Sequence, residues 1–153
     1  MERISNKELP HGFLTPLLKV QEYVDNAGLD RSLLELIRMR VSQINSCAYC
    51  LDMHFKEGIH AGETALRLIS VSAWKEAPYY YSPKEQAALA FAEHLTELPD
   101  EHGSAEIHDE LLKYFNKQEI AFLTLAIVQI NSWNRIVRSF GPVAGNYQVA
   151  KAA

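Results

Sequence analysis

The sequence predicts an all-α fold in one domain, and three observations carry that prediction. Apolar residues recur at helical spacing along most of the chain, from about Thr15 to Phe140. Several of these segments begin with capping patterns and end at glycine or proline. No segment alternates with a period of two, and no Asn-Gly hairpin is present. The chain has 153 residues, which suits a single domain (1–153) with a core expected over about residues 14–140.

The first two expected helices are delimited by proline, glycine and an acidic cap. Pro16 lies near the first turn of a helix that should end at Gly28, because proline suits a helix start and glycine a helix end. Asp30 is the expected N-cap of a second helix, which runs through Ile44. This second helix leads directly to the two cysteines.

Further helices are expected from Ser46 onward. Ser46 is a candidate N-cap for a helix that continues to Gly58 or Gly62, and Gly62-Glu63 would open another. An aromatic connector follows, in which Tyr79–Tyr81 would pack in the usual way, line a subunit interface or border a site. The run 82–85, Ser-Pro-Lys-Glu, is a strong helix start because it combines a serine cap, an early proline and a capping-box glutamate.

Three signals organise the last third of the chain. Ser104 is expected to cap a short helix, and Asn116-x-x-Glu119 is typical of a capping box at the start of the longest helix, which ends near Phe140. Residues 120–130 are apolar nearly all round, which predicts that this helix is the buried central one. The tail 143–153 has little to anchor it, so fraying is expected.

The composition is that of an ordinary globular protein and disfavours some classes of partner. Hydrophobic residues make up 48% and charged residues 22%, and the formal charge is −4 without a basic run, so neither nucleic acid nor a membrane surface is an expected partner. No apolar run reaches the ~20 residues of a membrane span, and the N-terminus does not read as a signal peptide. We therefore expect a cytoplasmic protein.

The two cysteines of the chain lie together as Cys47-x-x-Cys50, and His54 follows four residues later. On one helix these three positions share an arc of about 60°. Thiolate is favoured at a helix start, and a histidine one turn away can accept or donate a proton. Such a group suits thiol redox chemistry, in which one sulfur is oxidised to a sulfenic acid and the second captures it as a disulfide that an external thiol reduces.

Other interpretations of these residues stay open. The three side chains could ligate zinc with Glu35 as a fourth ligand, although one helix face fits a tetrahedral site poorly, so neither a metal nor a cofactor is expected. The cysteines could also be inert core residues. Without the spacing to the cysteines, the sequence around Glu35 predicts an ordinary helix carboxylate that forms an ion pair with Arg31, Arg38 or Arg40.

With Glu35 included, the pattern Glu-x11-Cys-x-x-Cys-x3-His resembles the alkylhydroperoxidase D (AhpD) / carboxymuconolactone decarboxylase-like superfamily. The likeness continues in Ser-x-x-Glu at 82–85 and in the helix whose residues 129–135 read Gln-Ile-Asn-Ser-Trp-Asn-Arg. It covers roughly Leu14 to Phe140.

The resemblance implies an all-helical homo-oligomer, often a trimer or hexamer, that reduces hydroperoxides through a Cys47/Cys50 dithiol-disulfide cycle. It implies that Cys50 is the peroxidatic cysteine, that Cys47 is its partner and proton donor, and that Glu35 and His54 form a relay. Helix electrostatics alone would favour Cys47 as the thiolate. Tyr49 occupies a position where the best-known member of the family has a histidine, which predicts a shorter relay and slow turnover.

Two alternatives accompany the peroxidase prediction, namely a general disulfide oxidoreductase and a non-catalytic redox-sensing helical oligomer. Decarboxylation is not expected, because decarboxylase members of the superfamily typically lack the cysteine pair. The family resemblance suggests a lipoyl-type adaptor or a small thiol as the reductant, and no docking site for either is evident in the sequence.

Overall fold

The computed structural model describes residues 2–99 and 103–150 and is all-helical over these residues, with no strand, as predicted. Short 3-10 turns occur at Asn6–Glu8, Val71–Glu76 and Pro78–Tyr80. The α-helices are α1 (Thr15–Asp25), α2 (Arg31–Ile44), α3 (Ala48–His60), α4 (Ala65–Ser70), α5 (Pro83–Glu97), α6 (Ser104–Leu111) and α7 (Lys117–Phe140).

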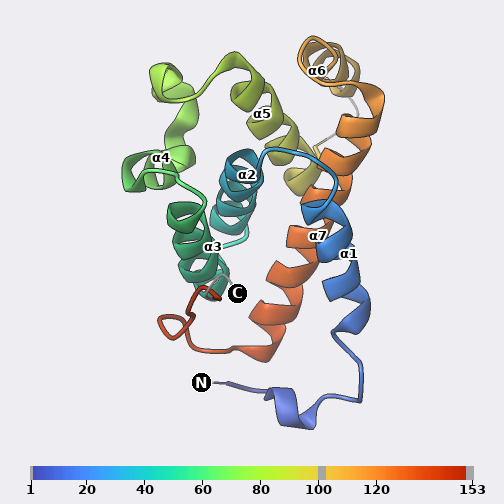
Figure 1. Cartoon of the computed structure of the whole chain (residues 1–153), viewed down its shortest axis with the longest axis vertical. Helices are drawn as coiled ribbons and strands as arrows, with labels where there is room; N and C mark the ends of the chain where they lie inside the picture. Colours follow the sequence, from blue (N-terminus) through green and yellow to red (C-terminus); the bar gives the residue numbers. More distant parts are fainter. Residues whose placement is uncertain (1, 100–102, 151–153) are drawn as a thin grey trace.

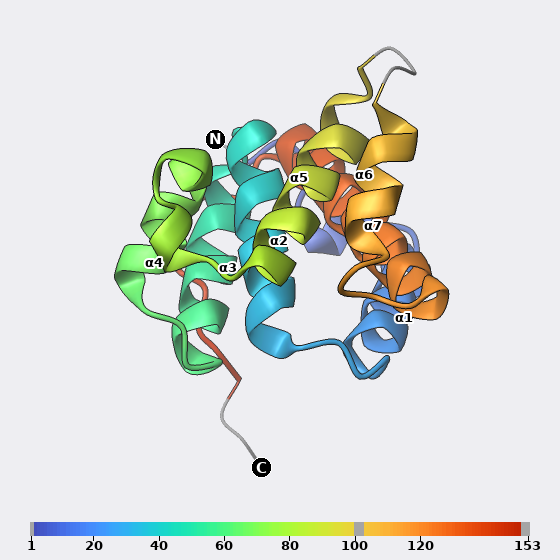
Figure 2. The same ribbon diagram turned by 90° about the horizontal axis from the view of Figure 1, so that it is seen from above.

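Helix α2 lies at the centre of the fold, with α3 on one side and α5 and α7 on the other (Figures 1 and 2). Nine of its 14 residues are buried, among them the charged Glu35 and Arg38. The prediction that residues 120–130 form the central helix is therefore wrong, because α7 buries one stripe only and leaves Val128 52% exposed. Because an α-helix repeats every 3.6 residues, neighbouring elements that pack on one side of it bury one stripe of its residues, whatever residues lie on the other side.

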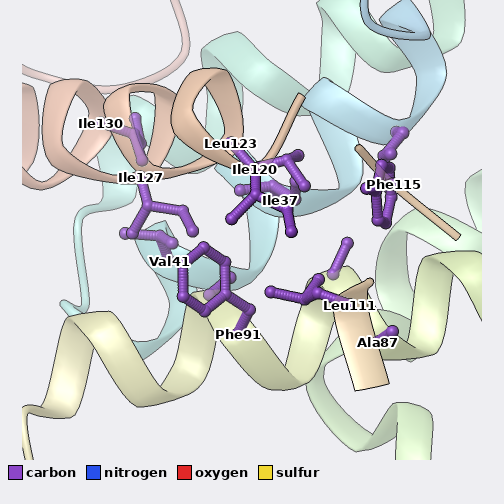
Figure 3. Close-up of a cluster of buried hydrophobic side chains, with 13 residues drawn as sticks. Ile37, Val41, Ala87, Phe91, Leu111, Phe115, Ile120, Leu123, Ile127 and Ile130 are labelled. Atoms are coloured by element: carbon purple, nitrogen blue, oxygen red, sulfur yellow. The ribbon is translucent and has the colours of Figure 1, made fainter. Parts of the chain in front are cut away.

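The main hydrophobic cluster joins α2 to α5, α6 and α7. Ile37 and Val41 of α2 face Phe91 of α5, and Leu123 and Ile127 of α7 close the cluster from the opposite side (Figure 3). By length and composition α7 could also cross a membrane, but it packs here against α1, α2 and α5 as a core helix. The packing of these helices fixes α2 and everything that its polar side chains touch.

The locally encoded caps agree with the sequence. The Asp30 side chain accepts a hydrogen bond from the Leu33 N–H (2.8 Å) at the start of α2. Reciprocal capping boxes open α5, between Ser82 and Glu85, and α7, at Asn116. These interactions span three residues of chain, so the sequence pattern was enough to predict them.

Two expected helix starts are displaced by one or two residues. Thr64, rather than Gly62-Glu63, caps α4, because its hydroxyl can accept a hydrogen bond from the Arg67 N–H. Gly103 precedes α6 and frees the Ser104 hydroxyl to bind His94 (2.9 Å) on α5. The Ser104 side chain, which the sequence predicted to cap α6 locally, therefore makes a tertiary contact with α5 instead.

The tail does not fray over its described part, contrary to the prediction. Its backbone runs beside α3 (Figure 1), where the Gly145 N–H donates to Asp52 (3.0 Å) and Lys56 donates to the Tyr147 carbonyl (2.9 Å). The Tyr147 hydroxyl donates to Glu57 in a short hydrogen bond. The polar face of α3 therefore anchors this segment through hydrogen bonds. Residues 151–153 of the predicted tail lie outside the described residues.

Candidate active site

The site begins at the sharp junction between α2 and α3. The Cys47 N–H donates to the Ser42 carbonyl (3.0 Å) and the Ser46 N–H to the Gln43 carbonyl (3.1 Å), which is the Schellman pattern that ends a helix. Ser46 adopts the left-handed conformation this pattern requires, with φ 51°. Ser46 therefore terminates α2 and does not cap α3 as expected, and Cys47 is the N-cap residue of α3.

The two cysteines are bonded to each other and buried. Cys47 and Cys50 form a disulfide with their Cα atoms 5.3 Å apart, and each residue is 1% exposed. Cys47 has an extended backbone, so only Cys50 and His54 share the helical face that the sequence predicted for all three residues. Both sulfurs lie at the N-terminal end of α3, where unpaired N–H groups favour a thiolate once the bond is reduced.

His54 and Glu35 meet between α3 and α2, as the pattern implied. The His54 Nδ1 atom lies 2.8 Å from Glu35 Oε2, and both residues are buried. The second oxygen, Glu35 Oε1, accepts a hydrogen bond from Arg38 Nη1 at 2.7 Å. Arg38 in turn donates through Nη2 to Asp25 at the end of α1, at 2.5 Å. Three helices thus contribute to one chain of charged and polar groups, which is buried except at Asp25.

The charges in this chain hold Glu35 ionised. Burial of the carboxyl opposes ionisation, but the hydrogen bond from His54, the charge of His54 when its ring is protonated and the charge of Arg38 outweigh it, so the pKa of Glu35 falls below its ordinary value. Burial likewise opposes the charged guanidinium, and the adjacent Glu35 and Asp25 carboxylates nevertheless raise the pKa of Arg38. The permanent cation and the carboxylate therefore stabilise each other within the fold.

An ionised Glu35 determines which nitrogen of His54 carries the proton. A carboxylate accepts hydrogen bonds and cannot donate them, so His54 Nδ1 must be the N–H that donates to it. In the neutral ring this leaves the lone pair on Nε2. Within the described part of the chain, Nε2 is buried and has no hydrogen-bond partner. It is therefore available to accept a proton from a reacting group beside it.

His54 and Cys50 line one cavity of about 270 Å³, together with Tyr49 and Met53 of the same helix. Most of its other walls are apolar side chains of α1, α7 and the terminal segments; they include Ile4, Leu14, Leu18, Trp133, Ile136, Val137, Phe140 and Pro142. Cys47 does not line this cavity. A small apolar molecule that enters it therefore lies beside Cys50 and not beside Cys47.

Arg3 holds the N-terminal segment over this cavity. Its backbone N–H donates to the Phe140 carbonyl (2.6 Å) and its side chain to the carbonyls of Ser139 and Arg138. These are the free carbonyls at the negative end of α7, which favour a cation. Ile4 is thereby placed in the cavity wall.

All four sequence-predicted residues come together, and two further charged residues, Arg38 and Asp25, extend the group. Arg38 was considered only as a competitor of His54 for Glu35, whereas the carboxylate binds both through separate oxygens. Asp25 carried no motif, because its role depends on how α1 packs. The zinc alternative finds no support in residues 2–99 and 103–150, where no group of three or more His, Cys, Asp or Glu side chains could hold a metal ion.

The chain has relatives among known sequences. Residues 13–94 match the model of the carboxymuconolactone decarboxylase family. The chain is 36% identical over 140 residues to the uncharacterized protein YdfG of Bacillus subtilis (strain 168), covering 92% of this chain and 95% of YdfG. It is 26% identical over 99 residues to the uncharacterized protein YnjA of Escherichia coli (strain K12), covering 65% and 53% of the two chains.

Solved structures share the fold. ATU0492 from Agrobacterium tumefaciens, described as a protein of unknown function and a candidate antioxidant defence protein AhpD, aligns with a TM-score of 0.88 at 32% identity, over 96% of this chain and 100% of that one. The debrominase Bmp8 aligns with a TM-score of 0.75 at 19% identity, over 86% and 70% of the two chains. The second likeness extends to the fold alone.

Proposed function

Because the chain belongs to the carboxymuconolactone decarboxylase family and keeps a cysteine pair beside a buried histidine, we propose that it is a thiol-dependent peroxidase of the AhpD type. The observation that carries the proposal is that Cys50 and His54 line the same cavity, while His54 Nε2 has no hydrogen-bond partner among the described residues. The likeness to ATU0492, a candidate antioxidant defence protein, supports the same activity.

The proposed reaction starts from the reduced pair. His54 Nε2 accepts the proton of the Cys50 thiol, and the thiolate attacks the outer oxygen of a hydroperoxide, ROOH. The O–O bond breaks, Cys50 becomes a sulfenic acid, and the alkoxide leaves as ROH with a proton from His54 or Cys47. The Cys47 sulfur then attacks the Cys50 sulfur and displaces water, which forms the disulfide. Two thiols and ROOH thus give one disulfide, ROH and water.

The position of the cavity supports Cys50 as the peroxidatic residue. Cys50 lines the cavity and Cys47 does not, although Cys47 is nearer the N-terminus of α3. Access of the substrate therefore outweighs the small electrostatic advantage of the N-cap position. The apolar walls favour organic hydroperoxides over hydrogen peroxide, because an alkyl group that enters them leaves water.

The burial of the sulfurs bears on the alternative of a general disulfide oxidoreductase. Exchange with a protein disulfide requires one sulfur to be reachable by a folded partner, but Cys47 and Cys50 are each 1% exposed. A small oxidant that enters the cavity fits this burial better. A non-catalytic redox-sensing oligomer differs from both because it would be oxidised once and would not turn over.

A cycling peroxidase needs an external thiol or dithiol that reduces the disulfide and is itself oxidised to a disulfide. A reducing cytoplasm would supply such thiols. A homo-oligomer, trimer or hexamer, is proposed by family; exposed apolar side chains on α1 and α7, such as Leu18 and Val128, are compatible with it.

The test is to count free thiols in the reduced protein before and after one equivalent of an organic hydroperoxide, and again after a dithiol is added. We expect two thiols to fall to none and to return. Cys50→Ser should abolish peroxide consumption, while Cys47→Ser should stop the cycle after one oxidation. His54→Ala should slow consumption by about 10²-fold or more, and His60→Ala, on the same helix but exposed, should not. Two thiols that persist in millimolar peroxide would exclude the peroxidase.

A further inference from the structure

Arg38 is the most deeply buried cation of the described chain and lies directly behind the proposed relay. Its side chain is 2% exposed and is the largest of the fully buried side chains. One terminal nitrogen binds Glu35 Oε1 and the other binds Asp25 Oδ1. Arg38 itself does not line the cavity and so cannot touch a substrate there.

The neighbours of Glu35 show what Arg38 supplies. His54 faces Glu35 from α3, and Asp25 approaches from α1 through Arg38. Among these groups Arg38 is the one permanent cation. A buried carboxylate without a cation takes up a proton, because an unpaired charge is strongly destabilised away from water.

We propose that Arg38 is a positioning residue for the relay: it keeps Glu35 ionised and directs the second carboxylate oxygen to His54 Nδ1, so that Nε2 presents a lone pair to Cys50. Asp25 fixes the other end of the guanidinium and thereby ties α1, which lines the cavity, to the relay. This inference rests on the proposed function, since it specifies how the base of that reaction is prepared.

Removing the cation should move a proton onto Nε2. Without Arg38, either Glu35 becomes a carboxylic acid that donates to Nδ1, or the imidazole becomes a cation beside a carboxylate. In both cases Nε2 carries a hydrogen and can no longer accept one from the Cys50 thiol. The change in protonation is specific, because a simple loosening of α2 would not select one ring nitrogen.

The experiment uses ¹⁵N NMR of the histidine ring nitrogens in the oxidised protein at about pH 8, above the ordinary range of histidine. In the disulfide form the cysteines do not titrate, so the His54 signal reports the relay alone. The wild-type protein should show Nδ1 with a hydrogen and Nε2 without one. A wild-type Nε2 that carries a hydrogen would overturn the proposal before any variant is made.

Three variants complete the test. Arg38→Met should place a hydrogen on Nε2, and Arg38→Lys, which restores a positive charge, should return the wild-type signal at least in part. Arg40→Met is the matched control, because Arg40 lies on the same helix and pairs with Glu93 at 2.7 Å, away from Glu35. It should lower stability without changing His54. The same signal in Arg40→Met and Arg38→Met, or a wild-type signal in Arg38→Met, would overturn the proposal.

The NMR result and the peroxidase assay can fail separately. If the reduced protein consumes no hydroperoxide but Arg38→Met still adds the hydrogen to Nε2, the proposed function fails and the positioning role stands. If peroxide is consumed and the Arg38→Met signal is unchanged, the peroxidase stands and Arg38 is a stabilising residue only. With both confirmed, Arg38→Met should also lower the rate of peroxide consumption by about 10-fold or more, as expected when a general base is blocked.

Discussion

Replacing Glu35 by glutamine tests whether the buried charge chain stabilises the fold as well as the site. The substitution keeps the size of the side chain but removes its charge and one of its two acceptor oxygens. Arg38 and His54 Nδ1 both donate to Glu35, so the amide can satisfy one of them and must turn its own NH₂ group toward the other. One of these two buried donors, on Arg38 or on His54, is left without an acceptor. The buried Arg38 cation also loses one of its two carboxylates.

The expected loss of stability follows from these contacts. Neutralising one member of a buried ion pair costs about 3–5 kcal/mol, and Glu35 is 1% exposed, so little solvent screening reduces this value. A domain of this size has a free energy of unfolding of about 5–15 kcal/mol, so the variant should still fold. Its melting temperature should fall by about 6–20 °C.

The loss should depend on pH in a defined direction. The pKa of Glu35 is lower in the folded protein than its ordinary value of 4.5, so the carboxylate contributes stability above that value. This contribution disappears as the pH falls through the folded pKa, because the wild-type residue then becomes neutral as well. The difference between the two proteins should therefore be constant near neutral pH and shrink in acid below about pH 4.5.

Urea unfolding at neutral pH and at about pH 4 measures the difference. Glu22→Gln, the same chemical change at an exposed position of α1, is the control and should stay within about 0.5 kcal/mol of the wild type. A Glu35→Gln loss below about 1 kcal/mol would mean that the buried pairs contribute little. A loss that is equal at the two pH values would refute the pH linkage.

Three further predictions concern other parts of the fold. Gly58→Ala should lower the free energy of unfolding by about 1–3 kcal/mol, because the new Cβ would lie 2.8 Å from a Leu68 side chain that is itself fully buried. Urea titrations measure this loss, and no loss would mean that Leu68 can repack. Burial and the nearby Glu57 carboxylate raise the pKa of Tyr147, so the neutral phenol holds the tail below about pH 10 and this attachment is lost as the pH rises through the raised pKa. Limited proteolysis near neutral pH should release the tail faster from Tyr147→Phe, which lacks the hydroxyl at every pH, and equal release there would contradict this. Arg3→Ala should speed alkylation of the cavity cysteine by a bulky reagent severalfold with little change in melting temperature, whereas an unchanged rate would show that the segment does not close the cavity.

Local signals predicted much of the fold. The caps at Asp30, Ser82 and Asn116 were confirmed because each depends on a side chain and a backbone N–H within three residues. Ser46 was assigned wrongly because the end of α2 and the start of α3 compete for the same residues, and the end of α2 prevailed. The tail was misjudged because its partners lie on α3, more than 80 residues earlier in the chain.

The same contrast between local signals and tertiary contacts applies to the residues of the candidate site. The sequence alone determined that Cys47, Cys50 and His54 share one short stretch and that Glu35 stands at the spacing of a known pattern. Glu35 lies on a different helix, α2, but Cys50 and His54 lie one turn apart on α3, so their shared face follows from the sequence. It could not decide between His54 and an arginine as the partner of Glu35, and the folded protein uses both, one on each oxygen.

Only the tertiary structure decided which cysteine lines the cavity and how Glu35 is held beside His54. The cavity beside Cys50 exists because residues of α1, α7 and both terminal segments come together beside α3, and these segments are far apart in the sequence. Arg38 reaches Asp25 because α1 ends beside α2. Contacts of this kind depend on the relative placement of whole helices, which is set by the sum of many weak apolar contacts and leaves no local pattern to read.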